Sequence, residues 1–154
     1  MTDQGVSGGG SKKGIKNVAL IAHDNCKLKL CDWIVTHRDK LQGCRLSATG
    51  TTGKLITEKS NLPVHCFNSG PLGGDQQIGA LISEGKIDLL IFFWDPLEPM
   101  SHDPDIKALL RLATLWNVPT ASNEATANFL ITSDLFANYQ PERPNFEAYL
   151  KRSV

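Results

Sequence analysis

Asp75 is the residue of this sequence with the clearest potential for proton-transfer chemistry. It follows the pair Gly73-Gly74, which would let a ligand approach the backbone closely. A carboxylate next to a bound substrate can act as a base, although Asp is also a favoured helix N-cap, and capping alone could explain it. Other acid–base side chains, which we expect at the same edge of the fold, favour a catalytic role over capping. They are His23, Asp24, Asp95, His102 and Asp105.

Two loops rich in glycine and hydroxyl groups could bind a phosphate. Thr49-Gly-Thr-Thr-Gly53 combines backbone N–H groups, threonine hydroxyls and the expected start of a helix, and these features favour an anion. A strand-to-helix turn capped by threonine would explain this loop equally well. Ser69-Gly70 repeats the chemistry, and Lys27 could add a compact positive charge. The candidate phosphate ligands are therefore Lys27, Thr49, Gly50, Thr51, Thr52, Ser69 and Gly70.

A parallel sheet would bring these loops together. Short apolar runs predict strands at 17–22, 45–48, 64–67, 88–94 and 118–121, the last one short because Pro119 cannot donate to a ladder. Helical spacing predicts helices between the strands, including 75–84, one beginning at 103, 123–131 and 146–152. We therefore expect one α/β domain over 15–154, with a five-stranded parallel sheet flanked by helices on both faces. In such a sheet ligands bind beyond the carboxyl ends of the strands, where these loops lie.

Composition narrows the possible partners and location. Lys plus Arg and Asp plus Glu both number 16, so no basic excess argues for nucleic acid or an anionic membrane. No apolar run approaches the roughly 20 residues that span a bilayer, and the N-terminus does not read as a secretory signal. We expect a cytoplasmic protein with a disordered tail over 1–14, which contains Gly-Gly-Gly-Ser.

Cofactor and metal signatures do not stand out in the sequence. The four cysteines lack Cys-x-x-Cys spacing, and His23-Asp24 and His102-Asp103 lack the spacings of zinc sites. The glycines of a dinucleotide fingerprint are missing after the first strand. We therefore expect no metal, no nucleotide cofactor and reduced thiols.

The sequence resembles the methylglyoxal synthase family from about residue 16 to residue 126. Five segments carry the resemblance: Ala-His-Asp at 22–24, Ala-Thr-Gly-Thr-Thr-Gly at 48–53, Ser-Gly-Pro-Leu-Gly-Gly-Asp-Gln-Gln at 69–77, Ile-Phe-Phe-Trp-Asp-Pro at 91–96 and His-Asp-Pro-Asp at 102–105. The resemblance implies a cofactor-free lyase that converts dihydroxyacetone phosphate to methylglyoxal and inorganic phosphate. It also implies inhibition by phosphate and assembly as a homohexamer.

The resemblance also implies roles for individual residues. Asp75 would be the base that takes a proton from the hydroxymethyl carbon, and His102 would act at the carbonyl and hydroxyl oxygens. A free Asp has a pKa of about 3.9, so we expect desolvation and neighbouring carboxylates to make Asp75 more basic. His23 would contact the substrate beside the phosphate ligands named above. The supporting residues would be Asp24, Asp95 and Asp105.

A basic residue near the C-terminus, supplied by a neighbouring subunit, would also reach the phosphate in this family. The ending Tyr149-Leu-Lys-Arg-Ser-Val154 does not align cleanly with the family pattern. Arg152 is our first candidate and Arg143 our second.

Two other functions are compatible with these residues. One is a non-catalytic regulatory module of the same fold that binds a phosphorylated effector, as in carbamoyl phosphate synthetases, but such a module does not require Asp75 or His102. The other is a cofactor-free isomerase of a phosphorylated ketose, which needs the same base and phosphate site. The products formed from dihydroxyacetone phosphate would separate the three.

Overall fold

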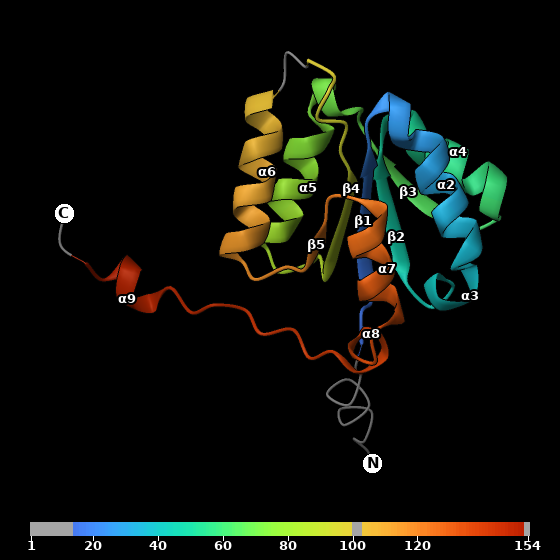
Figure 1. Ribbon diagram of the computed structural model, residues 1–154. Coiled ribbons are helices and arrows are strands. Elements are labelled where there is room, and N and C mark those ends of the chain that lie inside the picture. Colours follow the sequence, from blue (N-terminus) through green and yellow to red (C-terminus); the bar gives the residue numbers. More distant parts are fainter. Residues whose placement is uncertain (1–13, 100–102, 153–154) are drawn as a thin grey trace.

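A five-stranded parallel sheet forms the centre of the protein. The structure is a computed structural model that describes residues 14–99 and 103–152 (Figure 1). The strands are β1 (Asn17–Ala22), β2 (Arg45–Thr49), β3 (Val64–Phe67), β4 (Leu89–Phe93) and β5 (Thr120–Ala121). They run parallel in the order β3-β2-β1-β4-β5. The predicted fold class is confirmed.

Helices cover both faces of this sheet. One face carries α2 (Lys27–Thr36), α4 (Gly50–Ser60) and α7 (Glu124–Thr132), and the other carries α5 (Gly74–Ser83) and α6 (Asp103–Leu115). Figure 1 shows α5 and α6 side by side, with the sheet between them and the pair α2 and α4. The shorter elements are η1 (Asp24–Cys26), α3 (Arg38–Leu41), η2 (Gly70–Leu72), α8 (Leu135–Asn138) and α9 (Glu147–Leu150).

The side chains of β1 alternate between two hydrophobic cores. Val18 and Leu20 face the core under α2 and α4, whereas Ala19 and Ile21 face the core under α5 and α6. Every residue of β4 is buried, which is why its sequence is apolar at successive positions. These two central strands fix the position of the loops that follow them.

The last strand and the start of the domain were both predicted from the sequence. Strand β5 is only two residues long, as expected next to Pro119, whose carbonyl still accepts a hydrogen bond from Leu90 N–H at 2.9 Å. Residues 1–13 of the expected tail lie outside the described residues. Gly14, the last residue of the expected tail, is buried, and its N–H donates to the Tyr139 carbonyl at 2.9 Å, so this residue is part of the fold.

Asp88 lies at the amino-terminal edge of the sheet and connects the start of β4, the start of β1 and the C-terminal segment. It is 7% exposed and its Oδ2 accepts the backbone N–H groups of Lys16 and Asn17 at 3.0 and 2.9 Å. Its Oδ1 accepts from Arg143 Nη2 at 3.1 Å, and the same Arg143 nitrogen donates to the Ile87 carbonyl at 2.8 Å. This network ties the C-terminal segment to the entrance of β1.

Replacing this carboxylate should destabilise the fold. Asp88→Ala leaves two backbone N–H groups without their acceptor and the Arg143 guanidinium without its ion pair, and breaking such a pair costs about 3 kcal/mol. Chemical denaturation should show that loss in the free energy of unfolding. The matched control is Asp32→Ala at an exposed position of α2, which should change the free energy by less than about 0.5 kcal/mol. Equal stability of both variants would contradict the proposed role of Asp88.

No helix within residues 14–99 and 103–152 is long and apolar enough to cross a bilayer.

Candidate active site

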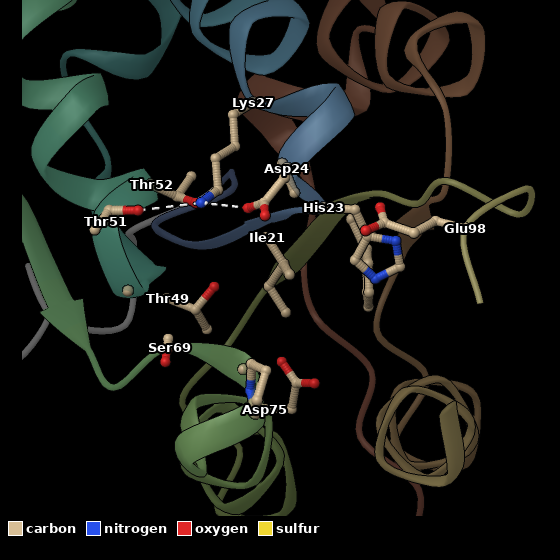
Figure 2. Close-up of a pocket in the computed structure, with 15 residues that line it drawn as sticks. Ile21, His23, Asp24, Lys27, Thr49, Thr51, Thr52, Ser69, Asp75 and Glu98 are labelled. Carbon is tan, nitrogen blue, oxygen red and sulfur yellow. Dashed lines mark hydrogen bonds and ion pairs between the residues drawn. The ribbon is translucent and has the colours of Figure 1, made fainter. Parts of the chain in front are cut away.

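A cavity of about 120 Å³ opens at the carboxyl edge of the sheet (Figure 2). From β1 the chain first adds β2 and β3 on one side and then adds β4 and β5 on the other, so the loops after β1 and β4 diverge and leave a crevice. Fifteen of the described residues line it: Ile21, Ala22, His23, Asp24, Lys27, Thr49, Gly50, Thr51, Thr52, Ser69, Gly70, Pro71, Asp75, Phe92 and Glu98. The strand-end loops thus converge as predicted.

Asp75 lies in the wall of this cavity and is not a helix cap. Gly73 occupies the N-cap position of α5, and Asp75 is the second residue of the helix, inside its first turn. The side chain is only 3% exposed. A Cβ atom at Gly70 would lie 3.2 and 3.3 Å from the two carboxylate oxygens of Asp75. The capping explanation is therefore wrong, and the loop before α5 packs closely around a buried carboxylate.

The two expected phosphate loops are joined to each other. Gly50 has a φ of +51° and its N–H donates to the Asn68 carbonyl at 3.1 Å. Gly74 N–H donates to the Ser69 carbonyl at 2.9 Å. A helix N-terminus, that of α4, therefore faces the cavity next to Ser69, and its N–H groups and dipole favour an anion there.

Lys27 is held over the first turn of α4. Its Nζ lies 2.8 Å from Asp24 Oδ1 and donates to Thr51 Oγ1 at 3.1 Å (Figure 2). The hydrogen bond and the charge of Lys27 lower the pKa of Asp24, so Asp24 stays ionised and keeps the ammonium group in place. Lys27, the first residue of α2, thus holds a cation against the loop that would meet an anion.

His23 is fixed by the loop after β4. The ring is 5% exposed, packs edge-to-face on Phe92 with centroids 5.3 Å apart, and its Nδ1 accepts the Asp95 backbone N–H at 3.0 Å. Because Nδ1 accepts, the proton of the neutral ring is on Nε2. His23 can therefore donate a hydrogen bond through Nε2.

Asp95 supports this arrangement from outside the cavity. Its carboxylate accepts from Asn25 Nδ2 at 2.9 Å and from Leu97 N–H at 3.0 Å. These two hydrogen bonds lower the pKa of Asp95. The carboxylate therefore holds the loop, while the backbone N–H of the same residue orients His23.

Among the described residues, three further expected positions do not line the cavity: Asp105, Arg143 and Arg152. His102 lies outside the described residues. Asp105 is half-buried in the first turn of α6 and is not part of the cavity wall. Arg143 pairs with Asp88 of its own chain at the opposite edge of the sheet, and its expected contact with a neighbouring subunit stays a prediction. Arg152 lies over the ring of Tyr149, with its Cζ 3.7 Å from the ring centroid.

Glu98 is a cavity residue that the sequence analysis missed. It lies in the loop after β4, beside His23 (Figure 2). Glu98 follows the carboxyl end of β4, where ligands bind in parallel sheets, so its loop was expected at the edge of the cavity. Nothing in its own spacing indicated which way the side chain points.

The fold and the cavity define a class of protein: a doubly wound parallel α/β protein with a candidate anion site and a buried carboxylate at its topological switch point. The sequence matches the family described as the MGS-like domain over residues 30–122. It is 67% identical over 142 residues to the methylglyoxal synthase of Hahella chejuensis, covering 92% of this chain and 93% of that one. It is 59% identical over 137 residues to the methylglyoxal synthase of Pectobacterium atrosepticum, covering 88% and 90%.

A solved structure agrees with these similarities. The crystal structure of methylglyoxal synthase from Elizabethkingia anophelis matches with a TM-score of 0.85 at 47% sequence identity, covering 93% of this chain and 95% of that chain. The chain therefore belongs to the methylglyoxal synthase family.

Proposed function

We propose that this protein is a methylglyoxal synthase, a lyase that converts dihydroxyacetone phosphate to methylglyoxal and inorganic phosphate. The observation that carries the proposal is that the buried carboxylate of Asp75 and both phosphate-type loops line one cavity. The names of the relatives, which match this chain over about nine-tenths of its length, support the same activity.

The first step would be proton transfer from carbon to Asp75. The Asp75 carboxylate would accept this proton, because it is 3% exposed in the wall of the cavity that the substrate would occupy. The C–H bond of the hydroxymethyl carbon breaks, its proton goes to the carboxylate, and its electrons form the enediolate double bond. Nε2 of His23 is one donor that could stabilise the developing charge on oxygen. The predicted partner in this task, His102, lies outside the described residues.

The second step would be loss of phosphate. The enediolate electrons form a new C–C double bond as the C–O bond to phosphate breaks, and the resulting enol takes up a proton on carbon to give methylglyoxal. Elimination is fast only when that C–O bond stands perpendicular to the enediolate plane. The loops around Thr52 and Ser69 would fix this torsion by holding the phosphate, and Lys27 would neutralise part of its charge.

The regulatory-module reading is less well supported. A pure binding module needs the phosphate loops but has no use for a carboxylate that is 3% exposed in the wall of its anion site. Burying such a charge is costly, and it would repel the bound phosphate. Relatives named as enzymes match almost the whole chain, which also favours catalysis.

The direct test is to incubate the purified protein with dihydroxyacetone phosphate and assay methylglyoxal and glyceraldehyde phosphate in parallel. A methylglyoxal synthase gives methylglyoxal and no glyceraldehyde phosphate. Glyceraldehyde phosphate alone would instead make the protein an isomerase. Phosphate binding without any turnover of dihydroxyacetone phosphate would favour the non-catalytic regulatory module.

Thr52→Ala should mainly weaken phosphate binding. Thr52 is 1% exposed at the start of α4, and losing one hydrogen bond to a charged group weakens binding roughly 10- to 100-fold. Calorimetry with inorganic phosphate measures the change directly. Thr57→Ala, at an exposed position further along the same helix, should bind phosphate as the wild type does. An unchanged affinity in Thr52→Ala would remove this residue from the site.

The homohexamer, the cytoplasmic location, inhibition by phosphate and the part played by Arg152 stay predictions from the sequence and the resemblance.

A further inference from the structure

Glu98 extends over the cavity from the loop between β4 and α6. Figure 2 shows it beside the His23 ring, across the cavity from Thr51 and Thr52. The loop is held in place because Asp95 accepts the Leu97 N–H at 3.0 Å and donates its own N–H to His23. Glu98 is therefore at the end of the cavity away from Thr51 and Thr52, next to His23.

One carboxylate oxygen of Glu98 is buried without a hydrogen bond. Within residues 14–99 and 103–152, Oε2 is shielded from solvent and has no hydrogen-bond partner. Buried acceptors are nearly always satisfied, because an unmade hydrogen bond to a charged group is costly. A carboxylate in such a position is suited to a donor that arrives with a ligand.

The chemistry of the cavity limits what that donor can be. Among the described residues no cluster of His, Cys, Asp and Glu is arranged to hold a metal ion. A phosphate group is an acceptor and would be repelled by Glu98, so it belongs at the α4 end of the cavity. A three-carbon phosphate bound there would direct its other end towards Asp75 and Glu98, and that end of dihydroxyacetone phosphate carries a free hydroxyl group.

We infer that Glu98 accepts the hydrogen bond of the free hydroxyl group of the substrate and so determines specificity for a hydroxymethyl ketone phosphate. This inference rests on the function proposed above. The bond would hold the hydroxymethyl carbon next to Asp75, with its C–H bond facing the base. It would also let the site reject phosphorylated ketones that carry a methyl group at this position.

The test pairs the carboxylate with the hydroxyl group. Dissociation constants are measured by calorimetry for dihydroxyacetone phosphate and for acetol phosphate, which has a methyl group in place of the hydroxymethyl group. Both ligands carry the same phosphate, so a general charge effect of Glu98 changes both alike. All proteins carry Asp75→Asn so that the substrate is not consumed, and Glu98→Leu and Glu98→Gln are added to this background.

With Glu98 present, the hydroxylated ligand should bind more tightly than acetol phosphate by roughly 10- to 100-fold. Glu98→Leu should abolish this preference, and Glu98→Gln should retain part of it, since a neutral acceptor makes a hydrogen bond about half as strong. Glu58→Gln, the same charge change at an exposed position of α4, should retain all of it.

An unchanged preference in Glu98→Leu would overturn the inference. If that variant does not fold, as judged by circular dichroism, Glu98→Gln decides: full preference overturns the inference and reduced preference supports it. Methylglyoxal formation by the wild-type protein is measured separately. Activity there combined with an unchanged preference means that only the role of Glu98 is wrong.

Discussion

Asp75→Asn should reduce kcat by about 10²- to 10⁴-fold, the usual contribution of a general base. The amide keeps the size of the side chain but cannot accept the carbon-bound proton. The position is 3% exposed in the first turn of α5, so the isosteric change should preserve the packing around Gly70. Steady-state formation of methylglyoxal from dihydroxyacetone phosphate measures the loss.

Phosphate binding separates loss of the base from loss of the site. The phosphate loops are built from other residues, and removing one negative charge from the cavity reduces repulsion of a phosphate dianion. Asp75→Asn should therefore bind inorganic phosphate as tightly as the wild type or more tightly. A variant within tenfold of the wild-type kcat would show that another group is the base. Loss of both turnover and phosphate binding would mean that the substitution disrupts the cavity.

Gly74→Ala should have the largest effect on stability of any single methyl group added at the site. A Cβ atom there would lie 1.9 Å from the Asn68 carbonyl oxygen and 2.9 Å from Thr49 Cγ2. The first contact is with backbone, so no side-chain rotation can relieve it. We expect a loss of about 3 kcal/mol or more, which for a domain of this size lowers Tm by roughly 6–12 °C.

Gly43→Ala is the matched control for this substitution. A Cβ atom at Gly43 meets nothing within 4 Å, and fewer conformations of the unfolded chain make such a change neutral or stabilising by up to about 1 kcal/mol. In thermal unfolding, Gly74→Ala should therefore lower Tm, whereas Gly43→Ala should leave Tm unchanged or raise it. An equal Tm and an equal phosphate affinity of Gly74→Ala and the wild-type protein would contradict this prediction. The two loops would then accommodate a Cβ atom at Gly74 without a clash.

The elements that position the site were predictable because burial leaves a clear pattern. β4 is covered on both faces, and its unbroken apolar run therefore predicted a central strand. The helix that begins at Gly50 was expected from the glycines and threonines of its first turn. Because ligands bind beyond the carboxyl ends of parallel strands, these patterns predicted Asp75, Lys27 and Ser69 at one edge of the sheet. All three line the cavity there.

What the sequence could not supply depends on contacts between distant residues. Asp75 follows two glycines in the sequence. Only the structure shows that the N-cap is Gly73, with a φ of +105°, two residues before the position that capping by Asp75 would need. The pair Asp88 and Arg143 joins residues 55 positions apart, with no periodic signal to connect them. Glu98 belongs to an irregular loop, where neither helical nor strand periodicity determines the direction of a side chain.

The central claim is that one cavity takes a proton from carbon and releases phosphate from the same molecule. Nuclear magnetic resonance of one reaction in heavy water tests it most directly, with phosphorus spectra for phosphate and proton spectra for methylglyoxal. The account predicts that dihydroxyacetone phosphate disappears while methylglyoxal and inorganic phosphate appear in equal amounts, with deuterium in the methyl group formed when the enol takes up its proton. Exchange of the hydroxymethyl protons without phosphate release, or phosphate release without methylglyoxal, would contradict it.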